Sequence, residues 1–228
     1  MIYLLYLFGF LPSIIWLLFY LRKDVHPESN QVVLKVFFYG MLIAFAAIFL
    51  EIGFKKISSN LLLYVFIGGA LIEECLKYSV VRFKVLRSSE LDEPIDIMLY
   101  MIIAGLGFAA LENILILINY HPFLELPKTL EIITLRFLTA TFLHALCSGI
   151  VGYFLAISFF NIKNQKKLLL MGLGIAIILH GLYNLSIIKI DGWEKFILPA
   201  IILIGAALFV SLGFKKLKRL KSICKVSI

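Results

Sequence analysis

A few ionisable side chains interrupt otherwise apolar stretches of this 228-residue chain. They include Glu73, Glu74 and Lys77 in the run 59–81, Glu112 in the run 94–119, Arg136 and His144 in the run 130–160, and His180 in the run 167–188. A charged side chain costs about 2.5–3.5 kcal/mol at the centre of a membrane-spanning helix. Because that cost is tolerated when such groups face one another or a water-filled cavity, we interpret these residues as candidates for one shared site.

Helical spacing supports a shared site. Glu73 and Lys77 are separated by four residues, and Glu74 reaches Lys77 across three, so one helix presents both carboxylates beside an ammonium. His180 and Asn184 are also four residues apart and therefore share a helix face. These two apolar helices each present a polar stripe.

Two further helices are expected to contribute. Arg136 and His144 lie on one stripe, with Thr141 beside it. Glu112 shares a face with Gly105, and small residues there allow close helix packing. Taken singly, each carboxylate and its cation fits a structural ion pair. The combination on four successive helices indicates a functional cavity.

Peptide-bond hydrolysis is the chemistry that these residue types suit. A glutamate can take a proton from water and return it to the leaving nitrogen, while histidine and asparagine donate hydrogen bonds to the developing oxyanion. We assign the catalytic roles to Glu73, Glu74, Glu112, His144, His180 and Asn184, with Lys77, Arg136 and Thr141 in support. Serine catalysis fits poorly because no GxSxG motif occurs.

A metal-dependent version of this chemistry is the alternative. Two histidines and a glutamate can hold Zn²⁺ with one position open for water. The ligands would come from Glu73, Glu74, Glu112, His144 and His180, because no HExxH motif is present. The residues do not decide between the two versions. We favour a glutamate-activated water that requires no cofactor.

Two other functions also use buried ionisable residues. A proton- or ion-coupled transporter relays charge through Glu, Lys and His, but the chain shows no inverted repeat. A non-catalytic homologue that kept its polar core is the second alternative.

The composition requires a lipid environment for this chain. Hydrophobic residues make up 62% of it, charged residues 16%, and the mean hydropathy is +1.01. Soluble domains contain roughly 45–50% apolar residues, so a soluble domain of this length would leave too much apolar surface in water. The composition predicts an integral membrane protein and excludes a nucleic-acid-binding domain, a secreted disulfide scaffold and a disordered chain.

Seven apolar runs are long enough to cross a bilayer of about 30 Å. They cover residues 1–21, 31–51, 59–81, 94–119, 130–160, 167–188 and 196–214. Backbone hydrogen bonds must be satisfied internally in lipid, so the runs are expected to be helices. We predict an all-α, polytopic membrane protein of about seven membrane-spanning helices, a single domain over 1–228, with a polar active-site cavity surrounded by the third, fourth, fifth and sixth helices.

Loop charges predict the orientation in the membrane. If the N-terminus is outside, 14 Lys and Arg residues lie on the cytoplasmic side and 5 on the other. Basic residues collect in cytoplasmic loops. We therefore expect the N-terminus outside and 215–228 as a basic cytoplasmic tail against anionic lipid.

Four motifs in the sequence are similar to those of a known family. Glu73-Glu74-Cys75-Leu76-Lys77 fits EExxK, Phe108-Ala109-Ala110-Leu111-Glu112-Asn113 fits FxxxEN, Arg136–Gly149 resembles the third motif, and His180-Gly181-Leu182-Tyr183-Asn184 the fourth. Together they resemble the PrsW family of intramembrane proteases, which is related to the CAAX-prenyl proteases and bacteriocin-processing enzymes. The similarity covers about half the chain.

The resemblance implies a bacterial or archaeal membrane peptidase. Such enzymes make the first, extracytoplasmic cut in a membrane-anchored anti-sigma factor, so the implied partners are a membrane-anchored protein substrate and the lipid bilayer. It also implies that Glu73, Glu74, Glu112, His144 and His180 belong to the active site.

Overall fold

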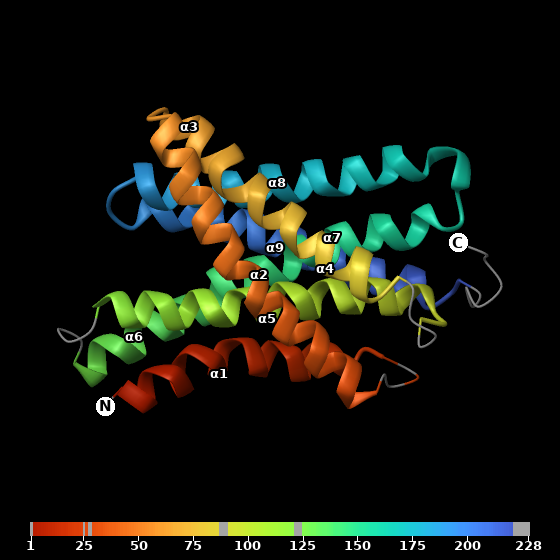
Figure 1. Cartoon of the computed structure of the whole chain (residues 1–228), viewed down its shortest axis with the longest axis horizontal. Helices are drawn as coiled ribbons and strands as arrows, with labels where there is room; N and C mark the ends of the chain where they lie inside the picture. The colour runs from red at the N-terminus through yellow and green to blue at the C-terminus, as the bar shows by residue number, and fades with distance from the viewer. Residues whose placement is uncertain (1, 25, 27–28, 87–90, 121–124, 221–228) are drawn as a thin grey trace.

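Helices account for all the regular structure in residues 2–24, 26, 29–86, 91–120 and 125–220, which the computed structural model describes. The long helices are α1 (Ile2–Leu21), α2 (Asn30–Ile57), α4 (Ile72–Lys84), α5 (Pro94–Tyr120), α6 (Leu126–Leu138), α7 (Ala140–Ser158), α8 (Gln165–Lys189) and α9 (Ile197–Leu217). Short helical segments connect them: α3 (Leu61–Leu63), η1 (Tyr64–Leu71), η2 (Ile162–Asn164) and η3 (Glu194–Phe196). Figure 1 shows most of the long helices running roughly side by side.

The predicted all-α, polytopic membrane fold is confirmed. Five helical segments are long and apolar enough to cross a bilayer: Asn30–Ile57, Pro94–Asn119, Leu126–Ser158, Ile162–Lys189 and Glu194–Leu217. The other two predicted spans are α1 and the continuous segment from α3 through α4. At 1.5 Å per residue the 20 residues of α1 extend about 30 Å, enough for a bilayer core.

Helix α5 is the centre of the fold and packs against α1, α2 and α7 (Figure 1). Its residues from Ile97 to Ala104 are completely buried. The close approach of α2 needs a residue without a side chain, because a Cβ at Gly40 would overlap the backbone of Ala104. This packing holds Glu112, further along α5, at a defined depth.

The segment that carries the two adjacent glutamates contains a π-helix. η1 covers Tyr64–Leu71 and leads directly into α4, whose first turn holds Glu73 and Glu74. π-Helical turns are rare and occur frequently at functional sites. The wider turn places Tyr64 and Gly69 on the same cavity as Glu73.

The run 130–160, taken from the sequence as one helical stretch, is divided at Thr139. Here the backbone leaves helical geometry, with φ −122° and ψ −84°, so α6 ends at Leu138 and α7 starts at Ala140. Side chains satisfy carbonyls near the break: the Thr139 hydroxyl donates to Leu135, and Trp16 Nε1 donates to the Phe137 oxygen at 2.9 Å. Arg136 and His144 therefore lie on two helices rather than on one stripe.

Several basic residues lie near helix ends at one end of the bundle. The end of the bundle where α1 and α9 finish also holds Arg82, Lys84 and Lys166. Lys221 and Lys225 of the predicted tail, and Arg87, lie outside the described residues. The orientation of the bundle in the membrane stays a prediction.

Candidate active site

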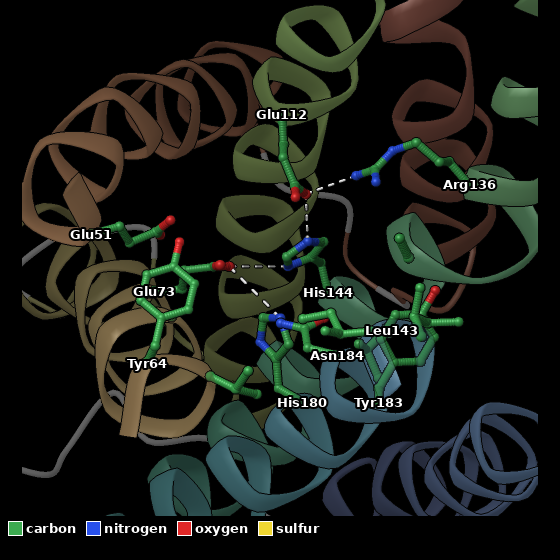
Figure 2. A pocket seen from close by; sticks show the side chains of 15 residues that line it. Glu51, Tyr64, Glu73, Glu112, Arg136, Leu143, His144, His180, Tyr183 and Asn184 are labelled. Carbon is green, nitrogen blue, oxygen red and sulfur yellow. Dashed lines mark hydrogen bonds and ion pairs between the residues drawn. The ribbon is translucent and has the colours of Figure 1, made fainter. Parts of the chain in front are cut away.

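A cavity of about 280 Å³ opens between the helices that carry the intramembrane charges (Figure 2). The predicted residues on its wall are Glu73 from α4, Glu112 from α5, Arg136 from α6, His144 from α7, and His180 and Asn184 from α8. Six candidates chosen by sequence thus meet around one space. Glu74, Lys77 and Thr141 do not line it.

The two adjacent glutamates have different positions. The Glu73 side chain is 10% exposed and lines the cavity, whereas that of Glu74 is completely buried behind it. Glu74 Oε1 accepts hydrogen bonds from Lys77 Nζ and His180 Nδ1, each at 2.8 Å. Its other oxygen is buried with no hydrogen-bond partner among the described residues. Of the pair, Glu73 is therefore the carboxylate that a substrate or a water molecule can reach.

Lys77 is fully buried and links three of the site's groups. Its ammonium donates to Glu74 at 2.8 Å, to Glu73 Oε2 at 3.2 Å and to His144 Nδ1 at 2.8 Å. The same Nζ lies 4.4 Å from the centre of the Phe108 ring, within cation–π range. A buried charge is stable only when it is paired and hydrogen-bonded. These contacts satisfy that requirement for Lys77.

Each histidine has one ring nitrogen against a carboxylate. His144 Nε2 lies 2.8 Å from Glu112 Oε2, and His180 Nδ1 lies 2.8 Å from Glu74 Oε1. Because a carboxylate accepts, these two nitrogens carry protons, and the other ring nitrogens, His144 Nδ1 and His180 Nε2, are the ones nearer Glu73. They lie 3.8 Å and 3.9 Å from Glu73 Oε2, respectively.

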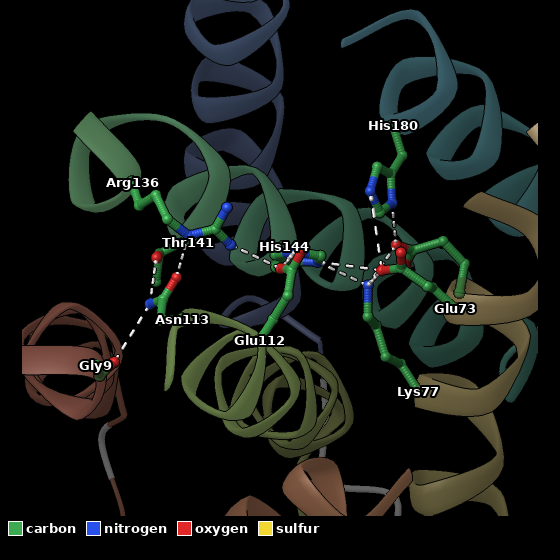
Figure 3. A network of polar contacts seen from close by, with 10 residues as sticks. Gly9, Glu73, Lys77, Glu112, Asn113, Arg136, Thr141, His144 and His180 are labelled. Atoms are coloured by element: carbon green, nitrogen blue, oxygen red, sulfur yellow. Dashed lines mark hydrogen bonds and ion pairs between the residues drawn. The ribbon is translucent and has the colours of Figure 1, made fainter. Parts of the chain in front are cut away.

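Arg136 and Thr141 belong to a second group of polar contacts, drawn in Figure 3. Arg136 Nη2 donates to Glu112 Oε2 at 2.8 Å, and its Nε donates to the Asn113 side-chain oxygen. Asn113 in turn donates to the Thr141 hydroxyl at 3.1 Å. This chain of bonds joins α5, α6 and α7 across the break at Thr139. It fixes the Glu112 carboxylate from the side opposite His144.

Asn184 is a predicted site residue of the cavity wall whose side-chain amide is free to bind another molecule. It lines the cavity and has no hydrogen bond to any described residue. Figure 2 shows it beside His180, one turn along α8. Its N–H donors are available to a molecule in the cavity.

Glu51 is a cavity residue that we did not identify from the sequence. It projects from α2, lines the cavity beside Tyr64, and forms no ion pair with a described residue (Figure 2). It is the last residue of the run 31–51, where a charge is ordinary for a helix reaching the membrane surface. The only signal available was an acidic residue in an apolar helix. The packing of α2 against η1 turns this end of the helix toward the site.

The donor set fits a divalent metal ion. One ligand atom from each of Glu73, Glu74, His144 and His180 lies within 4.8 Å of the others. Tetrahedral zinc ligands lie roughly 3.3–3.6 Å apart, close to the separations between Glu73 Oε2 and the two histidines. A histidine that binds a metal through one ring nitrogen usually donates a hydrogen bond from the other nitrogen to a carboxylate or carbonyl. Here His144 donates to Glu112 and His180 donates to Glu74. The Lys77 ammonium now contacts three of these four residues, so a bound cation would share them with it.

Comparison with known proteins gives one consistent result. A family model described as "PrsW family intramembrane metalloprotease" matches residues 28–212. A protein named Protease PrsW from Geobacillus kaustophilus is 32% identical over 177 residues, which cover 77% of this chain and 75% of the relative. Protease PrsW from Bacillus subtilis is 28% identical over 219 residues, 94% of each chain. No solved structure matches.

Proposed function

The chain belongs to the PrsW family of intramembrane proteases, and from that premise we propose that it cleaves membrane-anchored proteins at the cavity that contains Glu73. The observation that carries this assignment is the arrangement of Glu73 Oε2 within 3.9 Å of a ring nitrogen on each of two histidines. A charged carboxylate that is open to a cavity inside a membrane protein indicates function rather than packing.

Glu73 is assigned the role of general base. A water molecule in the cavity would lose a proton to the Glu73 carboxylate as its oxygen attacks the substrate carbonyl carbon. The carbon–nitrogen bond then breaks while the same proton passes to the leaving nitrogen. Glu74 has a supporting role, because it holds Lys77 and His180 in place without facing the cavity.

Asn184 is assigned to the oxyanion. Its amide forms no hydrogen bond with a described residue and lines the cavity, so its N–H groups are available to the negative charge that develops on the carbonyl oxygen. Glu112 and Arg136 orient His144 from outside the cavity's centre. Of the six predicted catalytic residues, Glu73 and Asn184 are assigned to the reacting atoms in this proposal, whereas Glu74 and Glu112 hold the two histidines in place.

A metal-assisted version is the second candidate, and the carboxylate on the far nitrogen of each histidine favours it. Glu73, His144 and His180 would hold the ion. The chemistry that a bound Zn²⁺ supplies is Lewis-acid activation of water and of the carbonyl. The donor role of Asn184 is the same in both versions, whereas Glu73 would be a ligand rather than the general base in the metal-assisted one.

For the substrate, we propose a single-span anti-sigma factor cut on the extracytoplasmic side, as the family resemblance implies. The unpaired Glu51 carboxylate adds a preference to this proposal. It lies on one side of the cavity and Arg136, already paired with Glu112, on the other (Figure 2). A substrate with a lysine or arginine near the scissile bond would supply the missing partner for Glu51.

The decisive experiment is proteolysis of a single-span reporter by purified protein in detergent or liposomes. Wild type should cleave it, and Glu73→Gln should lower the rate by about 10²–10⁴-fold, the usual value for loss of a general base. Adding a zinc chelator and measuring bound metal by elemental analysis separates the two versions. Full activity in metal-free protein excludes the metal, and full activity in Glu73→Gln overturns the assignment of the base.

A further inference from the structure

A second, larger cavity of about 790 Å³ lies between α1 and α9 and shares no lining residue with the cavity that contains Glu73. We call it the α1–α9 groove and define it by Trp16, Phe19 and Lys23 on the α1 side, Phe142 of α7 at its base, and Phe214 and Lys215 of α9. None of these residues takes part in the catalytic proposal.

Aromatic rings form the apolar part of this groove. Trp16 stacks on Phe142 with ring centres 4.1 Å apart, and it also donates a hydrogen bond to the Phe137 carbonyl. Tyr20 of α1 stacks on Phe214 of α9 at 5.9 Å and joins the two helices at the end of the groove. Phe19 is 44% exposed, so the groove opens to the lipid side of the protein. Its walls are held by specific contacts and do not depend on an occupant.

All the charge in the groove is positive and lies at one end. Lys23 lies two residues beyond the end of α1, Lys215 lies in the last turn of α9, and Lys218 directly follows α9. No aspartate or glutamate is among the described residues that line the groove. The two helices finish at the same end of the bundle (Figure 1), so the three ammonium groups gather where the membrane meets water.

The length of the groove matches one leaflet. From Ile15 to Lys23 is eight residues, about 12 Å along a helix, and from Ala207 to Lys215 is the same distance. Half of a bilayer core is about 15 Å. An acyl chain lying along the rings would therefore bring its phosphate to the level of the lysines.

We propose that the α1–α9 groove binds a phospholipid with a net negative headgroup. Clusters of basic residues between membrane helices are suited to anionic headgroups, and each lysine near such a surface contributes roughly a fivefold gain in affinity. Because no acidic residue is among the described residues that line the groove, its three ammonium groups repel a choline headgroup and attract a phosphate that carries no balancing cation. The apolar length of the groove excludes a free phosphate ion as the main ligand.

Trp16 provides the measurement. The chain contains two tryptophans, and Trp193 is 71% exposed at the opposite end of the bundle. In Trp193→Phe protein reconstituted in phosphatidylcholine, fluorescence quenching by lipids with brominated chains reports which lipid occupies the groove. Brominated phosphatidylglycerol should quench Trp16 with an apparent association constant at least about fivefold above that of brominated phosphatidylcholine.

The matched variants test the role of the lysines. Lys23→Gln/Lys215→Gln/Lys218→Gln should remove the preference, whereas Lys55→Gln/Lys56→Gln/Lys189→Gln, with equal loss of charge at the other end of the bundle, should keep it. Soluble glycerol phosphate should not relieve the quenching. Equal quenching by both lipids, a preference that survives the first triple substitution, or displacement by glycerol phosphate would each overturn the proposal.

Discussion

At the scale of single residues, the site depends on charges that are satisfied by one another. The buried Lys77 ammonium donates hydrogen bonds to Glu73 Oε2, Glu74 Oε1 and His144 Nδ1. Breaking a buried pair of this kind leaves an uncompensated charge and costs about 3–5 kcal/mol. Glu73 and Glu74 both pair with Lys77, but only Glu73 lines the cavity. Variants of the two glutamates can therefore separate catalysis from stability.

The first prediction concerns Glu73 and Glu74. Glu74→Gln should lower the thermal stability of the purified protein markedly, because Lys77 and His180 both lose their charged acceptor. Glu73→Gln should leave the melting temperature closer to that of wild type while abolishing turnover, because Glu73 faces the cavity and makes the longer bond to Lys77. Thermal unfolding followed by fluorescence in detergent measures both. A melting temperature lowered more by Glu73→Gln than by Glu74→Gln would contradict these roles.

The second prediction concerns Asn184. Asn184→Ala should reduce kcat by about 10²–10³-fold, the usual effect of losing one oxyanion donor. Its stability should stay near that of wild type, since the amide has no hydrogen bond within the described protein. Steady-state cleavage of a single-span substrate and a melting curve test the two statements together. An unchanged kcat would remove Asn184 from the proposed mechanism.

The third prediction concerns Glu51. Glu51→Gln should raise KM for a substrate with a lysine near the scissile bond, because the neutral amide of glutamine does not attract the lysine ammonium as a carboxylate does. A substrate with glutamine at that position is the control and should be cut equally well by both proteins. Paired measurements of KM on these two substrates give the answer, and an equal change on both would show that Glu51 does not recognise charge.

At the scale of helices, the reach from Glu112 to His144 depends on how closely α5 and α7 approach. A Cβ at Gly105 would lie 2.9 Å from the His144 carbonyl oxygen, which belongs to the backbone and cannot move aside. Gly205 of α9, in contrast, has open space within 4 Å. The same substitution at these two glycines therefore separates helix propensity from helix packing.

The fourth prediction follows from this contrast. Gly105→Ala should destabilise the protein by about 1–3 kcal/mol, as overpacking of a close contact does. Gly205→Ala should be neutral or stabilising by up to about 1 kcal/mol, because alanine is the better helix former. Thermal or denaturant unfolding in one detergent compares them. Equal effects would show that α5 and α7 are not in close contact at Gly105.

At the scale of the whole molecule, the basic residues collect at one end of the bundle. Both α1 and α9 finish at that end, and the cytoplasmic side of a membrane protein carries the excess of Lys and Arg. The Glu73 cavity and the α1–α9 groove lie in different parts of the bundle, so catalysis and lipid binding can be tested independently.

The fifth prediction is the topology itself. A reporter fused to the C-terminus should be active in the cytoplasm, and one fused after Gly192, between α8 and α9, should be active outside. The reason is that this orientation would place 14 basic residues on the cytoplasmic side and 5 outside. Paired phosphatase and fluorescent-protein fusions measure each position. The reverse pattern would mean that the chain crosses the membrane with its N-terminus inside.

The sequence alone determined the all-helical membrane fold and the group of ionisable residues that meet in it. Hydrophobic runs of sufficient length must become helices in lipid, and charges inside them must find partners. For this reason the sequence alone was enough to identify Glu73, Glu112, His144 and His180 as site residues. Those inferences need only local periodicity and the cost of burying charge.

Only the tertiary structure decided which of the two adjacent glutamates, Glu73 or Glu74, reaches the cavity. Glu73 and Glu74 are adjacent and chemically identical, and the direction of each depends on how α4 meets α7 and α8. The break at Thr139 and the inward position of Glu51 likewise depend on contacts between helices distant in sequence. Periodicity describes one helix at a time, whereas exposure and pairing are set by where the neighbouring helices lie.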